Sequence, residues 1–283
     1  MSHLNHVSDK LVIALQVVFL LAGCSLSPLR HSDEQAKDLG FARTIVAGHD
    51  FQHVVYSNRR TSRADLAHVY LEGDGSPWIG ERRISTDPGP RNPLMLKLMA
   101  LDSTASLYLG RPCYHGFYNQ PPCNPGLWTH GRYSRQVIDA MAQALERIAS
   151  EQGYAHVVLI GYSGGGTLAM LLAEQVPNAV AVVTIAGNLD PDEWARHHDY
   201  SPLWTSLNPS SRTPLPPAIF QLHVAAENDG IVPAEMVLRA AAHQHNPEIM
   251  LVPGADHACC WLEMWPSVLA TLDARVEHLI KHQ

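Results

Sequence analysis

Residues 157–166 of this chain read VVLIGYSGGG, and a segment with small residues at helical spacing follows them. The apolar run predicts a buried strand, and the glycines around Ser163 predict a tight turn in which a bulky side chain would not fit. This is the G-x-S-x-G pattern between a strand and a helix, an arrangement that lifts a serine hydroxyl above the edge of a sheet. The pattern predicts Ser163 as a nucleophile and the backbone N–H of Gly164 as a donor to an oxyanion.

On either side of this turn, short apolar runs alternate with segments of helical spacing. Beyond β-rich stretches within 41–57, we expect strands over residues 67–71, 105–109, 157–160, 180–185, 218–225 and 248–252. We expect helices over residues 93–101, 133–152, 167–175, 233–243 and 261–280. This alternation predicts the α/β class, as a three-layer sandwich in which helices cover both faces of a mostly parallel sheet of about eight strands. A (β/α)8 barrel alternates in the same way, but the serine turn argues against it.

Composition narrows the function classes. The chain has 283 residues, of which 46% are apolar and 17% charged, with a formal net charge of −7. Such a chain can bury a large core, which excludes a disordered protein. No long basic run is present, so a nucleic-acid partner is not expected. We predict one domain over residues 41–283, with a small cap insertion at about 187–217.

The first apolar run predicts a targeting signal. Residues 11–22 contain a single polar residue, and twelve residues are too few to span a bilayer, which takes about 20. The run ends in LAGC, which resembles the bacterial lipobox, so we predict a lipoprotein signal peptide over 1–23 and lipidation, as by palmitate, at Cys24. Residues 24–40 are expected to be a polar tether, and Ser25 favours the outer membrane, facing the periplasm. The alternative is an N-terminal core helix with a chance cysteine.

A serine hydroxyl needs a base, and the base needs an orienting acid. When the serine lies in a G-x-S-x-G turn between a strand and a helix, the acid comes later in the chain and the histidine comes after the acid. Asp229 lies in a turn just past the expected strand 218–225 and is the predicted acid. Glu227 is its rival, and Asp190, after the preceding strand, is a second one.

His257 is the predicted base because of its position. It follows the last expected strand and precedes the last expected helix, whereas most of the 17 histidines have no such placement. Its neighbour Asp256 is interpreted as a loop residue. The pair His197-His198 is interpreted as solvated, and no His/Cys spacing matches a structural zinc site, so neither a metal nor a cofactor is expected.

With the turn at Ser163, the D-x-x-V-P segment at Asp229 and the histidine after Gly254, the chain over residues 41–283 resembles the α/β-hydrolase-fold serine hydrolases of the esterase and lipase type. The resemblance implies a triad of Ser163, Asp229 and His257.

The resemblance also implies a second oxyanion donor. The family's third strand ends in a His-Gly pair, and here the pair is Glu72-Gly73. The second donor is then the backbone N–H of Asp74, with the neighbouring Gly75 as the alternative.

Four cysteines remain if Cys24 is lipidated. Cys259 and Cys260 are adjacent, with Cα atoms about 3.8 Å apart, which is below the usual range for a disulfide and disfavours a bond between them. The resemblance implies that the strands leading to 113 and 259 are far apart in the sheet. The expected bond is therefore Cys113–Cys123.

These features together predict a serine hydrolase that cleaves carboxylic esters through an acyl-enzyme on Ser163, acting on small-molecule or lipid esters. Long loops over 111–132 and 187–217 are rich in aromatic residues and proline and are candidates for the pocket wall. The alternatives are a thioesterase or a peptidase or amidase on the same fold, or a catalytically dead, membrane-tethered binding protein.

Overall fold

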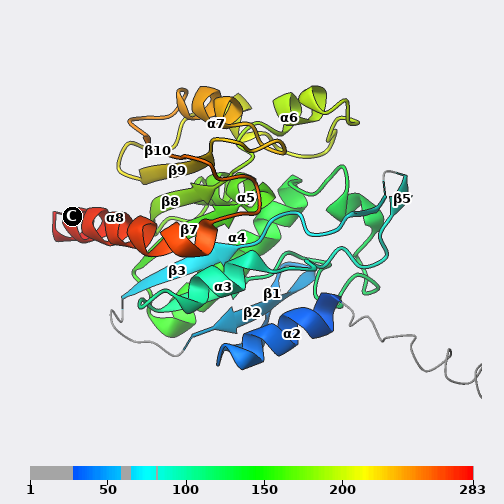
Figure 1. Ribbon diagram of the computed structural model, residues 1–283. Helices are drawn as coiled ribbons and strands as arrows, with labels where there is room; N and C mark the ends of the chain where they lie inside the picture. The colour runs from blue at the N-terminus through cyan, green and yellow to red at the C-terminus, as the bar shows by residue number, and fades with distance from the viewer. Residues whose placement is uncertain (1–27, 59–64, 81, 283) are drawn as a thin grey trace, which may run out of the picture.

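The computed structural model describes residues 28–58, 65–80 and 82–282. An eight-stranded sheet with the order β1-β2-β6-β3-β7-β8-β9-β10 forms its middle layer (Figure 1). The strands β1 and β2 run antiparallel to their neighbours, and the remaining pairs are parallel. The strands are β1 (Ala42–Gly48), β2 (Phe51–Ser57), β3 (Leu66–Leu71), β6 (Ser106–Leu109), β7 (His156–Tyr162), β8 (Ala179–Ile185), β9 (Phe220–Ala226) and β10 (Glu248–Val252). A separate two-stranded ribbon pairs β4 (Trp78–Ile79) with β5 (Arg83–Ile84).

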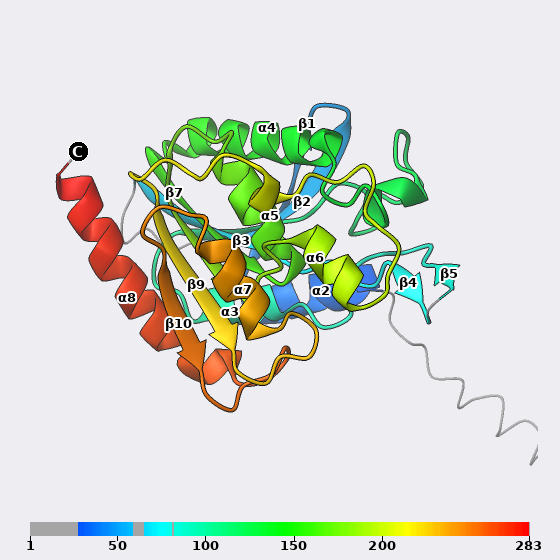
Figure 2. The ribbon, with the colours of Figure 1, turned by 90° about the horizontal axis from the view of Figure 1, so that it is seen from above.

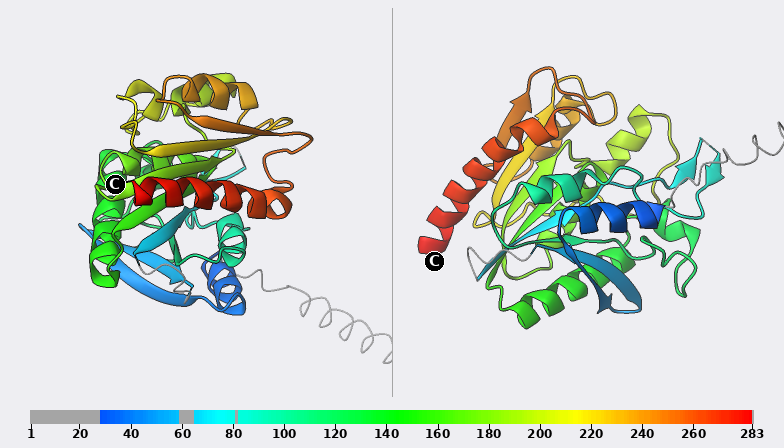
Figure 3. Two further views of the ribbon diagram at one scale, coloured as in Figure 1. Left: turned by 90° about the vertical axis from the view of Figure 1, so that its left-hand side faces the viewer. Right: turned by 60° about the horizontal axis from the view of Figure 1, so that its bottom comes forward.

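Helices cover both faces of the sheet. One core cluster joins the sheet to α4 (Arg135–Gln152), α5 (Gly164–Ala173) and α7 (Ala234–Ala241). The other joins it to α2 (Pro28–Asp38), α3 (Leu94–Ala100) and α8 (Trp261–Lys281). Figures 2 and 3 show α4 on one side of the sheet and α3 and α8 on the other. The predicted three-layer architecture is thus confirmed.

The burial of the central strands on both faces explains why their sequences are continuous apolar runs. In β7, Val157 and Leu159 belong to one core cluster and Val158 and Ile160 to the other, because successive side chains of a strand point to opposite faces. A parallel strand covered by helices on both faces buries every position and therefore needs no polar alternation.

The ends of α4 follow from its flanking residues. The Ser134 side chain accepts a hydrogen bond from the backbone N–H of Val137, so the helix begins at Arg135 rather than at the predicted residue 133. At its other end Gly153 has a φ of 75°, the left-handed conformation that commonly ends a helix.

The prediction of a polar tether is wrong for residues 28–38, which form helix α2. Ser32 and Ala36 face inward and are buried, four positions apart as one helix face requires. On the same helix, Asp33 accepts hydrogen bonds from the Tyr56 hydroxyl at 2.6 Å and the Arg43 guanidinium at 2.9 Å. This segment therefore docks on β1 and β2. The predicted lipidation site, Cys24, lies outside the described residues.

The insertion at 187–217 contains a short helix, α6 (Pro191–His197), and a 3-10 turn over Pro209–Ser211. The Asp190 side chain accepts hydrogen bonds from the Glu193 N–H and the Asn208 amide, so this acid caps α6. No helix in the described part of the chain is both long and apolar enough to cross a membrane.

Candidate active site

Ser163 sits in a strained turn between β7 and α5. Its φ of 53° and ψ of −120° lie outside the regions that a residue with a side chain ordinarily adopts. The Ser163 N–H donates to the Ile185 carbonyl at 2.9 Å, and its own carbonyl accepts from Gly166 and Asn188. A Cβ at Gly161 would lie 2.0 Å from the Gly165 carbonyl oxygen, so the turn closes only with glycine there.

The structure brings Ser163, His257 and Asp229 into one hydrogen-bonded chain. His257 Nε2 lies 3.0 Å from Ser163 Oγ, and His257 Nδ1 lies 2.7 Å from Asp229 Oδ2. The other Asp229 oxygen accepts from the backbone N–H groups of Ile231 and Val232, each at 2.8 Å. Because the carboxylate only accepts hydrogen bonds, Nδ1 of His257 carries the proton of the neutral ring. Nε2 is therefore unprotonated and can accept the proton of the serine hydroxyl.

His257 is fixed from behind by its own carbonyl oxygen. That oxygen accepts from the Tyr162 hydroxyl at 2.8 Å and from the Trp261 indole N–H at 2.9 Å. The rival acid Glu227 and the neighbouring loop residue Asp256 form loop contacts instead. Glu227 accepts from the Gly254 N–H, and Asp256 accepts from the first two N–H groups that follow His257.

The loop after β3 passes directly beside the serine. A Cβ at Gly73 would lie 3.5 Å from Ser163 Cβ, and a Cβ at Gly164 would lie 2.1 Å from Asp74 Oδ1. Gly164 is the first residue of α5, so its N–H comes before the first bond within that helix. Gly164 and the Gly73-Asp74 segment, which carry the two predicted oxyanion donors, therefore lie next to the serine.

The Asp74 carboxylate points away from the serine into a cluster that the sequence did not reveal. It contacts Arg111 at 2.9 Å, Arg132 at 2.8 Å and the Tyr133 hydroxyl at 2.7 Å. Burial opposes ionisation of Asp74, but the two guanidiniums and the hydroxyl outweigh it and lower its pKa. Arg111 lies two residues after the end of β6, which is the one local signal for this cluster, whereas Arg132 and Tyr133 have no such signal.

Glu72, which replaces the expected histidine, anchors the neighbouring helix. Its carboxylate accepts from the backbone N–H of Gly73 at 3.2 Å and of Met95, in the first turn of α3, at 3.1 Å. Burial raises the pKa of Glu72 to about 7, although these bonds and Arg111 act in the opposite direction.

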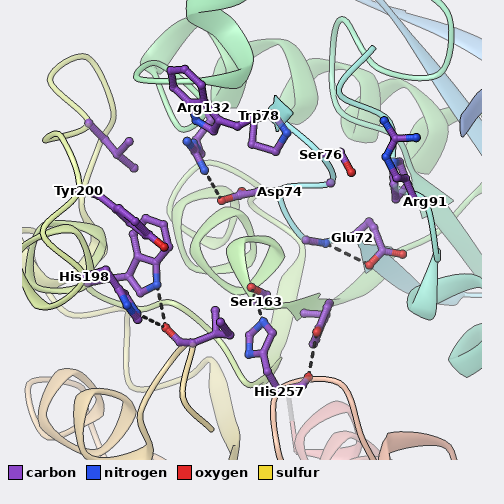
Figure 4. A pocket seen from close by; sticks show the side chains of 18 of the residues that line it. Glu72, Asp74, Ser76, Trp78, Arg91, Arg132, Ser163, His198, Tyr200 and His257 are labelled. Carbon is purple, nitrogen blue, oxygen red and sulfur yellow. Dashed lines mark hydrogen bonds and ion pairs between the residues drawn. The ribbon is translucent and has the colours of Figure 1, made fainter. Parts of the chain in front are cut away.

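A pocket of about 930 Å³ opens over Ser163 and His257. On the cap side it is lined by Trp194, His198 and Tyr200, and the ring nitrogens of Trp194 and His198 each lie 2.8 Å from the Ile231 carbonyl oxygen. His198 is therefore partly buried in the pocket wall, whereas its neighbour His197 is exposed. Figure 4 shows Ser163 and His257 between this wall and Arg91.

The described part of the chain contains two disulfides. Cys113 and Cys123 are bonded, with Cα atoms 5.5 Å apart, in the loop after β6. Cys259 and Cys260 are also bonded, against the prediction, which considered only their Cα separation. Cys260 has a φ of 78° at the start of α8, a conformation that a sequence pattern does not reveal. Within the described residues, no three His, Cys, Asp or Glu side chains gather where they could hold a metal ion.

Residues 112–258 match the family described as the alpha/beta hydrolase fold. No curated protein matches the sequence.

Solved structures match over most of the chain. An esterase from Pyrococcus furiosus has a TM-score of 0.56 at 15% identity, covering 91% of this chain and 94% of its own. A proline iminopeptidase-related protein from Thermus thermophilus has a TM-score of 0.58 at 12% identity, covering 86% and 99%. A serine hydrolase without a lid from Xanthomonas campestris has a TM-score of 0.51 at 12% identity, covering 86% and 94%. At these identities the likeness is one of fold.

Proposed function

The chain belongs to the alpha/beta hydrolase fold family, and on that basis we propose that it is a serine hydrolase that cleaves carboxylic esters through an acyl-enzyme on Ser163. The observation that carries this proposal is the hydrogen-bonded chain from Asp229 through His257 to Ser163, at the base of a pocket. The neighbours from Pyrococcus furiosus and Xanthomonas campestris, an esterase and a serine hydrolase, support the same chemistry.

The proposed reaction uses each contact once in each half. Ser163 Oγ attacks the ester carbonyl while His257 Nε2 takes its proton, and Asp229 stabilises the imidazolium through Nδ1–H. The imidazolium then gives its proton to the departing alcohol, which leaves an acyl-serine. Water attacks the acyl-serine with His257 again as base, and the acid departs as Ser163 regains its proton.

Negative charge on the carbonyl oxygen is stabilised in two ways. The backbone N–H groups of Gly164 and Asp74 are the proposed donors, and loss of one such donor costs about 3 kcal/mol of barrier. On the side chain of the same Asp74, Arg111 and Arg132 share a single carboxylate, so these three buried groups carry a net positive charge. A positive charge fixed in a poorly solvated site stabilises a developing anion.

Esters are favoured over peptides because the cover on the pocket is small. In the described part of the chain, the insertion over the pocket consists of α6 with its flanking loops. A thioesterase would use the same residues and is distinguished by substrate alone.

We further propose that the chain is a lipoprotein held at a bacterial outer membrane through acylated Cys24. The sequence LAGC at the end of a signal-like apolar run supports this.

Labelling with a fluorophosphonate tests both proposals. In cells that express the full chain, we expect label on Ser163, recovered in the membrane fraction, and its loss in His257→Ala. Glu227→Gln is the matched control, since Glu227 contacts the loop and not the histidine. Failure of Ser163 to label in folded protein would contradict the enzyme proposal, and labelled Cys24→Ala protein that stays on the membrane would contradict the anchor.

A further inference from the structure

The two sides of the pocket differ in chemistry. The cap side presents the aromatic rings of Trp194, His198 and Tyr200, which contact one another with ring centres 5.2 to 5.6 Å apart. The segment that follows β3 presents Arg82 and Arg91 instead. In Figure 4, Arg91 lies on the far side of Ser163 from His198 and Tyr200.

Both guanidiniums are available to a ligand. Arg82 and Arg91 are exposed and line the pocket, and within the described residues neither has an ion-pair or hydrogen-bond partner. Close by in the chain, the Lys97 ammonium donates to the Asn92 side chain at 2.7 Å, and Asn92 also lines the pocket. This rim therefore carries two arginines, and the Lys97 ammonium is bonded to a third residue of the rim, Asn92.

Among the described residues, the acids that line the pocket do not neutralise them. Asp74 is held by Arg111 and Arg132, and Glu72 is buried against backbone N–H groups. Asp199, the third acid among the described lining residues, lies on the cap between His198 and Tyr200 and thus belongs to the opposite side. A substrate with a negatively charged end is therefore attracted by Arg82 and Arg91 and repelled by Asp199 on the cap.

Resting on the proposed function, we propose that the substrate is an ester with an anionic oxygen group, a carboxylate or a phosphate, that Arg82 and Arg91 bind. Guanidiniums suit both groups because their planar N–H donors match the spacing of the oxygens. The apolar part of the substrate then lies against the aromatic wall, with the ester between them at Ser163.

Two matched ester pairs test this with the full chain. Para-acetoxybenzoate is compared with para-acetoxybenzamide, and phenyl para-carboxybenzoate with phenyl para-carbamoylbenzoate. Each pair differs by a carboxylate against a carboxamide, on the alcohol side and on the acyl side respectively. Each kcat/KM is divided by the rate constant for hydroxide-catalysed hydrolysis, which removes differences in intrinsic reactivity.

A second arm separates a lipid headgroup from a soluble anion. Lysophosphatidylglycerol is compared with the monoacylglycerol of the same acyl chain, both in neutral detergent micelles. A preference for the anionic member in either arm supports the inference, and the arm that shows it identifies the source.

The variants are Arg91→Gln and Arg82→Gln, with Arg147→Gln as the control that removes the same charge from the exposed surface of α4. We expect the anionic-to-neutral ratio to fall by about threefold or more in each pocket variant, the size typical of an exposed ion pair. It should stay at the wild-type value in Arg147→Gln. Because the guanidiniums are exposed, raising the salt from about 0.05 M to about 0.5 M should reduce the wild-type ratio as well.

The outcomes separate the two proposals. Equal ratios in the wild type and all variants, with the esters hydrolysed, overturn the anionic substrate and leave the esterase standing. No hydrolysis of any ester and no fluorophosphonate label on Ser163 overturn the proposed function, and the inference with it.

Discussion

At the scale of single residues, the site depends on a glycine whose need is steric. Gly164 follows Ser163 and starts α5, where an ordinary helical residue would be acceptable on backbone grounds. A Cβ there would lie 2.1 Å from Asp74 Oδ1 and 2.4 Å from the Tyr133 hydroxyl oxygen. Both atoms belong to a buried ion cluster that cannot easily move. The residue type at 164 is thus set by the loop that carries the second proposed oxyanion donor.

For this reason Gly164→Ala should displace that loop and weaken the oxyanion interaction. We expect kcat to fall about a hundredfold or more, the size found when one oxyanion donor is lost. Steady-state hydrolysis of a phenyl ester measures this, with folding checked by circular dichroism. The matched control is Gly230→Ala, where an added Cβ meets nothing within 4 Å. Equal kcat in Gly164→Ala and the wild type would contradict the proposed donor arrangement.

At the scale of elements, Asp74 ties together three segments that are distant in sequence. Its partners come from the loop after β6 and from the turn that enters α4, and Tyr114 donates to its backbone carbonyl at 2.9 Å. The carboxylate thereby fixes the position of the loop after β3 relative to Ser163. The cluster joins the stability of the domain to the geometry of the site.

Removal of the negative charge of Asp74 should therefore lower both the stability of the domain and the activity of the site. In Asp74→Asn, two buried guanidiniums lose their counter-charge, and breaking such a pair costs about 3 kcal/mol or more. We expect the free energy of unfolding in urea to fall by that order, and kcat to fall with it. Glu174→Gln, which breaks the more exposed pair with Arg212, should cost about 1 kcal/mol or less. Equal losses in the two variants would show that the cluster has no special role.

Features that depend on neighbours in the chain could be predicted from the sequence, and features that depend on distant contacts could not. The strands, α4 and the positions of Ser163, Asp229 and His257 follow from periodicity and from the order of motifs, because neighbours in the chain set them. Helix α2 and the bond between Cys259 and Cys260 do not, since burial of Ala36 and the left-handed backbone at Cys260 depend on distant parts of the fold. The Asp74 cluster spans 58 residues between its carboxylate and Arg132, and no local pattern records such a contact.

At the scale of the whole molecule, buried histidines make stability depend on pH. Burial lowers the pKa of His53, His115 and His223 to about 4, from an ordinary value of 6.5. Between these values the unfolded chain binds three protons that the folded chain does not, so stability falls as the pH drops below 6.5. Glu72 offsets one of these three protons. Its pKa of about 7 means that between pH 4.5 and pH 7 the folded chain holds a proton that the unfolded chain does not.

The net difference of two protons predicts that the free energy of unfolding rises by roughly 3 kcal/mol per pH unit between about 4.5 and 6.5. Above pH 7 these four groups contribute no further slope. Urea denaturation across this range measures the effect. His223→Gln should remove about one proton from the slope, whereas His245→Gln, at an exposed position, should leave it unchanged. A flat profile in the wild type would contradict this account.

The docked position of α2 bears on how the enzyme would meet its substrate. A Cβ at Gly116 would lie 2.8 Å from Leu29, so α2 begins against the loop after β6, at the edge of the sheet where the pocket opens. Four Cα–Cα steps separate Cys24 from Pro28, which is a reach of about 14 Å at full extension. If Cys24 is acylated as proposed, the start of α2 would lie within that distance of the lipid headgroups and would keep the pocket near them. Encounter then becomes a search over a surface, in which the areal density of the substrate in the bilayer, rather than its bulk concentration, sets the rate.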